Sequence, residues 1–169
     1  TGEGDVFCAG FDLGEFQVDD AEFQRDLWAS SDRYHRTVLE FPLPVVAAVN
    51  GPALAGGFDL AVMCDIRIAS TTARFSHPEI AFGDVVYGPL HDLVGGAVAR
   101  DLCFTGRVVE ADEALRLGLV SAVVEPADLL AVAGERAAMV AKGPRDVLLR
   151  MKAKAQRRAG ITPGATLDL

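Results

Sequence analysis

Apolar residues recur at intervals of three, four and seven residues early in the chain, at Phe23, Leu27, Tyr34, Val38 and Phe41. This is the spacing of one face of an α-helix. Asp19 and Glu22 have the spacing of a capping box at its start, and Pro42 and Pro44 follow its end. The pattern predicts a long amphipathic helix over residues 19–41.

The pattern then changes to short apolar runs that are typical of buried strands. Residues 45–49 are β-branched or alanine and lie between Pro44 and Gly51, which predicts a strand buried on both faces. A turn is expected at residues 51–57, followed by a short helix at 58–64. Further strands are expected at residues 66–69 and 73–76.

The last part of the chain is more helical. Helices are predicted over residues 89–104, 111–117 and 126–142, with a strand at 119–124 between the last two. Gly143 and Pro144 are expected to end one helix and begin another. Alternating short strands and helices predict an α/β fold with a helical C-terminal third.

Composition narrows the class of protein. The chain has 169 residues, half of them apolar, which is the size and character of one globular domain. A net charge of -8 argues against nucleic acid as a partner. Residues 44–64 are as long as a bilayer span, but two prolines, three glycines, Asn50 and Asp59 favour a buried core over a membrane helix.

The three cysteines, Cys8, Cys64 and Cys103, have neither disulfide nor metal-site spacing. They favour a reducing compartment, for which we expect the cytoplasm, and no bound metal. Gly56 and Gly57 introduce the short helix at 58–64. Backbone N–H groups at such a start lack helical partners and attract an anionic oxygen, although close helix packing also explains two glycines.

Four segments together are more specific: residues 7–13 (FCAGFDL), 50–70 (NGPALAGGFDLAVMCDIRIAS), 73–83 (ARFSHPEIAFG) and 104–124 (FTGRVVEADEALRLGLVSAVV). In order and spacing they resemble the crotonase (enoyl-CoA hydratase/isomerase) family. The resemblance implies a crotonase-type (ClpP/crotonase) spiral of ββα units. Residues 1–109 would form part of its core and residues 110–169 the truncated helical C-terminal region of the same domain. Family members usually assemble as trimers or pairs of trimers, and we expect further family elements beyond both ends.

The resemblance also implies an acyl-CoA thioester substrate, with coenzyme A entering as part of it and no separate cofactor. By the same resemblance, the N–H groups of Phe11 and Gly56 form an oxyanion hole, and Glu79 and Asp59 are the catalytic carboxylates. Fixed N–H dipoles stabilise the negative charge that develops on a thioester oxygen. The residues expected to contact acyl-CoA are Phe11, Asp12, Leu13, Gly14, Gly56 and Gly57.

Two departures from the family pattern leave the reaction open. Hydratases of the family usually carry Glu where this chain has Asp59. Residues 83–96 are shorter than usual, and Asp84, Tyr87 and His91 could add polar groups to the pocket or simply lie in a rearranged loop. His77 is expected to face solvent. The basic run over residues 142–158 could attract the phosphates of coenzyme A, or it could be a solvated helix face.

We therefore expect an enzyme of fatty acid metabolism such as β-oxidation, and an enoyl-CoA hydratase in the first place. A double-bond isomerase acting on enoyl-CoA or dienoyl-CoA is the nearest alternative. Hydrolysis or decarboxylation of an acyl-CoA or β-diketone, and a non-catalytic acyl-CoA-binding subunit, also remain open.

Overall fold

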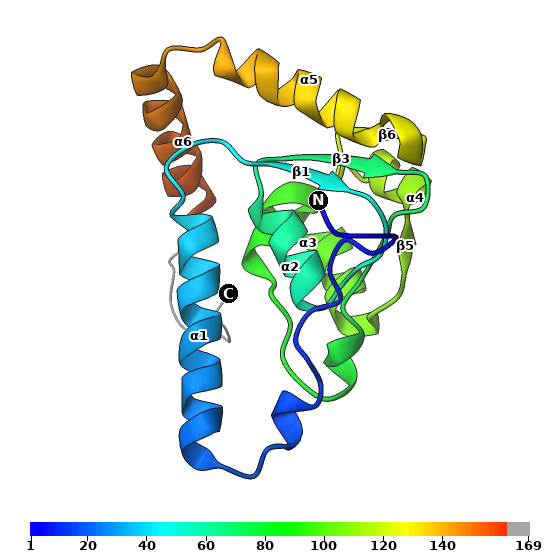
Figure 1. Ribbon diagram of the computed structural model, residues 1–169, viewed down its shortest axis with the longest axis vertical. Coiled ribbons are helices and arrows are strands. Elements are labelled where there is room, and N and C mark those ends of the chain that lie inside the picture. The colour runs from blue at the N-terminus through cyan, green and yellow to red at the C-terminus, as the bar shows by residue number, and fades with distance from the viewer. Residues whose placement is uncertain (162–169) are drawn as a thin grey trace.

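A computed structural model describes residues 1–161 of the chain. Two three-stranded sheets, with strand orders β1-β3-β6 and β2-β4-β5, form its centre, and helices surround them (Figure 1). The strands are β1 Val46–Val49, β2 Ala53–Leu54, β3 Ile66–Ser70, β4 Arg74–Ser76, β5 Val109–Glu110 and β6 Ala122–Val124. The α-helices are α1 Ala21–Leu39, α2 Gly56–Met63, α3 Gly88–Thr105, α4 Ala111–Arg116, α5 Leu129–Ala141 and α6 Arg145–Ala159. The described residues also form three short 3₁₀ helices: η1 Glu15–Gln17, η2 Pro78–Ala81 and η3 Pro126–Asp128.

The first sheet is parallel throughout, and the second is mixed. In the first, β3 pairs in parallel with β1 on one side and with β6 on the other. In the second, β2 and β4 are parallel, whereas β4 and β5 are antiparallel. Cys8 extends the second sheet through a parallel bridge to Ala53. This bridge fixes the N-terminal loop beside the segment that leads into α2.

Small and aromatic side chains fill the core around α2. Phe58 and Phe75 are fully buried, with ring centroids 5.5 Å apart. The alanines and valines of β1 and β2 allow close approach of these elements, as their two-sided burial requires. A second cluster forms where α5 covers β1 and β3, through Ala48, Ile68, Leu129 and Ala133.

Helix α1 runs along one side of the molecule, and α6 lies beyond its C-terminal end (Figure 1). Gln156 of α6 donates a hydrogen bond to the carbonyl of Leu39 at the end of α1. Lys152, which is buried, pairs with Asp65 at an Nζ–Oδ2 distance of 2.6 Å. These two contacts tie α6 to α1 and to the start of β3.

The structure confirms most of the predicted elements and corrects some details. The cap of α1 is Asp20, not Asp19, because the Asp20 carboxylate accepts from the N–H groups of Glu22 and Phe23. The segment expected to be a turn contains the two-residue strand β2, which pairing with β4 stabilises. Helix α3 is kinked at Gly95, where φ is +76°.

The predicted limit between residues 109 and 110 falls inside β5, and residues 162–169 of the predicted C-terminal region lie outside the described residues. Within residues 1–161, no helix is both long enough and apolar enough to cross a bilayer. The segment over residues 44–64 is instead divided among β1, β2 and α2 of the core.

Candidate active site

A cavity of about 550 Å³ lies between α1, the N-terminal loop, the start of α2 and the segment around η2. Five of the predicted site residues line it: Phe11, Leu13, Gly56, Asp59 and Glu79. They come from three segments that are distant in the sequence. The other residues that line it are Ala9, Phe16, Gln17, Trp28, His35, Ala55, Phe82, Gly83, Asp84, Val85 and Val86.

The two residues predicted to supply the oxyanion-hole donors, Phe11 and Gly56, both line this cavity. Helix α2 begins at Gly56, after Ala55 with its unusual φ of +52°. Within residues 1–161, neither the Gly56 N–H nor the Phe11 N–H donates a hydrogen bond. The first N–H groups of a helix lack partners and carry the positive end of its dipole, so Gly56 suits an anionic oxygen.

Gly10 allows the N-terminal loop that carries Phe11 to contact the loop that leads into α2. Its φ is +86°, and a Cβ there would lie 3.0 Å from the backbone nitrogen of Gly56. The close contact brings the Phe11 segment next to the start of α2, as an oxyanion hole with two donors requires. Gly57 has a different task, since a Cβ on it would lie 2.0 Å from the carbonyl oxygen of Cys8.

Three residues predicted to contact acyl-CoA are not among those that line the cavity. Gly57 packs under Cys8, and the Asp12 carboxylate accepts a hydrogen bond from the Gly14 N–H at 2.8 Å. Asp12 and Gly14 are exposed on the loop beside the cavity. Their predicted contact with the ligand stays a prediction.

Asp59 is buried and lies between two histidines. Its Oδ1 is 2.9 Å from Nε2 of His77, and its Oδ2 is 3.8 Å from Nε2 of His35. A Cβ on Gly56 would lie 4.0 Å from Oδ2, so this oxygen lies beside the start of α2. His77 is therefore not solvent-facing, as expected from the sequence, but buried with 1% of its surface exposed.

The surroundings shift the pKa values of this group. Burial alone would raise the pKa of Asp59, but the neighbouring imidazoles of His35 and His77 outweigh burial and lower it. Burial would lower the pKa of His77, yet Asp59 raises it to about 9. The pKa of His35 is raised above its ordinary value for the same reason, also against burial.

Glu79, in η2, faces the same cavity under opposite conditions. Its Oε2 is buried and has no hydrogen-bond partner within the described residues. Burial, assisted by the charge of Asp59, raises the pKa of Glu79. A carboxylate with a raised pKa can both take and return a proton near neutral pH, which is what general acid–base catalysis needs. Side-chain atoms of Asp59, His77 and Glu79 lie within 4.8 Å of one another, so the charges of the three groups influence one another.

Phe11, Phe16 and Trp28 form an aromatic wall of the cavity. Phe16 is 5.5 Å from Phe11 and 5.9 Å from Trp28, measured between ring centroids. Trp28 comes from α1, so this helix supplies both an apolar side chain and His35 to the cavity. Such a wall suits the apolar part of a ligand.

Sequence reasoning missed His35, although a signal existed. Trp28, Ser31 and His35 share one helical face at spacings of three and four residues. Of the polar residues expected from the shortened segment, only Asp84 lines the cavity. Tyr87 and His91 contact one another instead, at a centroid distance of 5.4 Å.

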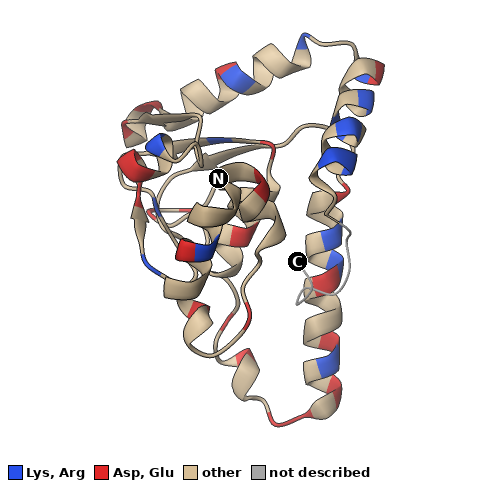
Figure 2. Cartoon of the chain, turned by 180° about the vertical axis from the view of Figure 1, so that it is seen from behind, with Lys and Arg blue, Asp and Glu red and all other residues tan. Residues whose placement is uncertain are grey.

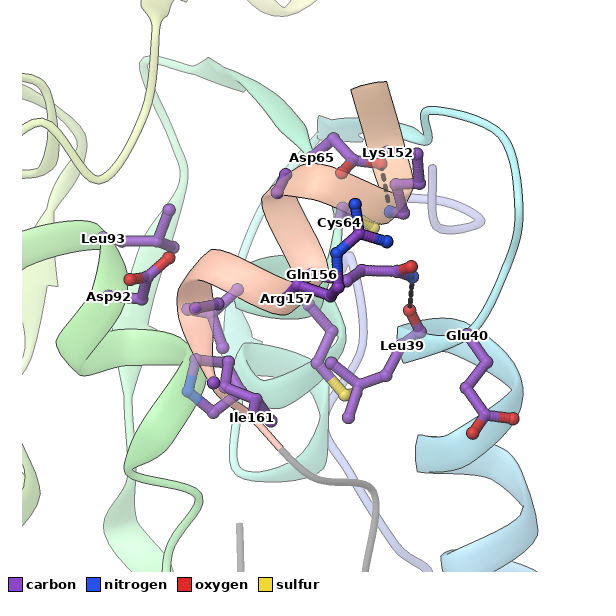
Figure 3. A pocket seen from close by; sticks show the side chains of 16 residues that line it. Leu39, Glu40, Cys64, Asp65, Asp92, Leu93, Lys152, Gln156, Arg157 and Ile161 are labelled. Atoms are coloured by element: carbon purple, nitrogen blue, oxygen red, sulfur yellow. Dashed lines mark hydrogen bonds and ion pairs between the residues drawn. The ribbon is translucent and has the colours of Figure 1, made fainter. Parts of the chain in front are cut away.

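A second cavity, of about 560 Å³, lies between α6, the end of α1, the end of α2 and the start of α3 (Figure 3). Neither Glu79 nor Asp59 lines it. Lys and Arg residues gather along α6 (Figure 2), and two of them, Lys152 and Arg157, line this second cavity. None of the basic residues of α6 lines the cavity that holds the carboxylates, and most are exposed.

Known enoyl-CoA hydratases are similar to the chain in sequence. The chain is 42% identical to the short-chain-enoyl-CoA hydratase of Clostridium acetobutylicum over 90% of its own length, and 43% identical to the crotonyl-CoA hydratase of Syntrophomonas wolfei over 77%. It spans only 61% and 52% of the length of these two relatives.

Solved structures give the same answer for the fold. The enoyl-CoA hydratase of Bacillus anthracis matches 96% of the chain with a TM-score of 0.87 and 33% identity, and the chain covers 65% of that structure. A Geobacillus kaustophilus enoyl-CoA hydratase subunit matches 96% of the chain with a TM-score of 0.84 and 34% identity, and 64% of that structure is covered. The predicted crotonase-type fold is confirmed. Because the family model for enoyl-CoA hydratase/isomerase also matches residues 1–166, the chain belongs to the enoyl-CoA hydratase/isomerase family.

Proposed function

We propose that the protein is an enoyl-CoA hydratase, which adds water across the double bond of a 2-enoyl-CoA thioester. One observation carries the proposal. A single cavity is lined by two residues whose backbone N–H groups donate no hydrogen bond within residues 1–161, and by two carboxylates whose pKa values are shifted in opposite directions. The hydratase names of the two relatives described above support it.

In this mechanism the thioester oxygen accepts hydrogen bonds from the N–H groups of Phe11 and Gly56. Addition to the conjugated double bond places negative charge on that oxygen. Each donor of this kind contributes about 3 kcal/mol to transition-state stability in mutational tests. The acyl chain lies along the aromatic wall of Phe11, Phe16 and Trp28.

The two carboxylates then have different tasks. Ionised Glu79 takes a proton from the water molecule while the water oxygen bonds to the β-carbon. The electrons of the double bond move into the enolate. Glu79 returns that proton to the α-carbon, and the thioester carbonyl is restored. Asp59, with its lowered pKa, stays ionised and accepts a hydrogen bond from the water, which holds it in place.

Incubation of the purified protein with 2-enoyl-, 3-enoyl- and dienoyl-CoA tests the proposal. A hydratase removes the absorbance of the conjugated 2-enoyl thioester, and the product carries a 3-hydroxyl group. Conversion of 3-enoyl-CoA into 2-enoyl-CoA without hydration of either would contradict the proposal.

Double-bond isomerisation is the second candidate. The observation that favours it is that Oδ1 of Asp59 is occupied by His77, which leaves one oxygen of Asp59 to hold water. In an isomerase, Glu79 would remove a proton from one carbon and return it to another, and no water would be consumed. The same three substrates separate the two reactions.

We also propose that the protein works as a homo-oligomer, a trimer or a pair of trimers, in the cytoplasm, with no cofactor beyond the coenzyme A of its substrate. Large apolar side chains are exposed on the helices, among them Phe104 at 74%, Leu130 at 63% and Met139 at 62%, and contacts between subunits would bury such groups. Cys8, Cys64 and Cys103 are all free thiols, which suits a reducing compartment.

A further inference from the structure

Asp59, His35 and His77 form a buried group that the hydration mechanism does not by itself require. Their exposed fractions are 6%, 2% and 1%. They belong to α2, α1 and the loop before η2, so the group joins three elements. An ionised carboxylate that is buried without partners is strongly disfavoured, and two imidazoles here provide partners.

The geometry on the His77 side fixes Asp59. The Nε2–Oδ1 distance of 2.9 Å is that of a hydrogen bond, which His77 donates. The ring of Phe58 lies against His77 at a centroid distance of 4.5 Å, which restricts the orientation of the imidazole. Oδ1 is thereby occupied, and Oδ2 is directed to the start of α2 and the cavity.

His35 lies beside Oδ2, the other carboxylate oxygen of Asp59. Nδ1 of His35 lies 2.9 Å from the carbonyl oxygen of Ser31, and since a carbonyl only accepts, Nδ1 carries the hydrogen. A neutral His35 would then turn the lone pair of Nε2 towards Oδ2 of Asp59. Protonation replaces this repulsion with an N–H group beside a carboxylate, 3.8 Å away. The arrangement therefore favours a cationic His35 on the cavity wall.

We propose that His35 and His77 are positioning residues that clamp Asp59 from both sides, so that its Oδ2 serves the cavity as a constant hydrogen-bond acceptor and never as a proton donor. The inference rests on the proposed function for its purpose, because a water molecule or substrate must use that oxygen. It explains how an aspartate, one methylene shorter than glutamate, is held at this position.

The titratable groups that face the clamp come from α1, α3 and the segment around η2. Asp59 is faced by Tyr34 and His35 from α1, His77 from the loop before η2 and Glu79 from η2. His35 is also influenced by Asp32, and His77 by Cys103 of α3. If either imidazole is removed, burial is less opposed, so the pKa of Asp59 rises and the residue protonates at higher pH.

The test replaces each histidine by a neutral hydrogen-bonding residue. His35→Gln and His77→Gln keep a polar side chain but lose the charge, and His91→Gln, at the exposed third histidine outside the cavity, is the matched control. Carbon-13 NMR of protein labelled at the aspartate carboxyl follows the ionisation of Asp59, whose signal is assigned by its loss in Asp59→Asn.

We expect the ionisation midpoint of Asp59 to rise by about one pH unit or more in His35→Gln and in His77→Gln. His91→Gln leaves this midpoint unchanged. A merely structural role of the two histidines would lower stability or kcat/KM without moving the Asp59 midpoint. Unchanged Asp59 midpoints in both variants would overturn the clamp.

The outcome is separable from that of the proposed function. A shifted Asp59 midpoint in a protein without hydratase activity upholds the clamp and rejects the hydratase. Hydratase activity with an unchanged Asp59 midpoint in both histidine variants upholds the hydratase and rejects the clamp. The NMR measurement needs no substrate, so neither result depends on the other.

If the histidine variants do not fold, the wild-type protein and Asp59→Asn still decide. The pKa of His77 is raised to about 9 in the folded protein, so its stabilisation is complete below pH 6.5 and lost as the pH rises through 9. The free energy of unfolding of the wild type should therefore fall over this range, and more steeply than that of Asp59→Asn. Equal slopes would contradict the clamp.

Discussion

Glu79 and Asp59 lie in one cavity, yet their surroundings push their pKa values in opposite directions. Glu79 has a buried oxygen without a partner within the described residues, whereas Asp59 has two imidazoles. In the proposed mechanism, environment rather than residue type therefore assigns the roles, with Glu79 as the proton carrier and Asp59 as the fixed acceptor.

The raised pKa of Glu79 predicts a specific pH dependence. As the base, Glu79 must be ionised, so kcat/KM should increase with pH through the pKa of Glu79 in the free enzyme, at a midpoint above its ordinary value of 4.5. A pH–rate profile with 2-enoyl-CoA measures the midpoint. A midpoint at or below 4.5 would show that Glu79 is not the base.

For single residues, the sequence predicts which backbone N–H groups are available better than it predicts what surrounds a side chain. The N–H of Gly56 is available because of a local helix start, and a glycine pair before an apolar run reveals it. The burial of His77 and the approach of His35 depend on where α1 packs against α2. No local pattern encodes that contact, so His77 was wrongly expected in solvent.

Among the elements, α2 is the one on which the cavity depends. It begins immediately after the strained Ala55, it packs against β2, and it carries Gly56 and Asp59. Because Gly57 has no side chain, the N-terminus of α2 can lie against the N-terminal loop at Cys8. The helix periods and the strands of the first sheet were predictable, but β2 was not, because a two-residue strand depends on its partner β4.

Gly57→Ala tests this packing. A Cβ would lie 2.0 Å from the carbonyl oxygen of Cys8, so backbone must move, and we expect a loss of about 1–3 kcal/mol in the free energy of unfolding. Urea titration measures the change. Gly134→Ala in α5 is the control, since nothing lies within 4 Å of its Cβ, and it should gain about 0.5–1 kcal/mol from helix propensity. Equal effects of both substitutions would contradict the proposed packing.

At the scale of the whole molecule, the basic helix α6 packs against the core and α1, and none of its residues lines the cavity that holds the carboxylates. Its residues line the second cavity (Figure 3), and its buried Lys152 pairs with Asp65. The run of charge along the sequence did not reveal which lysine was buried. That distinction depends on where α6 returns to the core.

Lys152→Ala should weaken the packing of α6 against the core. Breaking a buried ion pair costs about 3–5 kcal/mol, and because Asp65 is partly exposed we expect about 2 kcal/mol of lost unfolding free energy. Lys154→Ala, at an exposed position of the same helix, should change it by less than about 0.5 kcal/mol. Thermal and urea unfolding of both variants compare the two, and matching losses would remove the special role of Lys152.

The central claim is that Glu79 directs the addition of water to an enoyl thioester. Its most direct test is turnover of 2-enoyl-CoA in ¹⁸O-labelled water, followed by mass spectrometry of the product. The wild type should place one ¹⁸O in the 3-hydroxyl group, and Glu79→Gln should form this product about 10²–10⁴ times more slowly. A product without ¹⁸O, or full activity of Glu79→Gln, would contradict the claim.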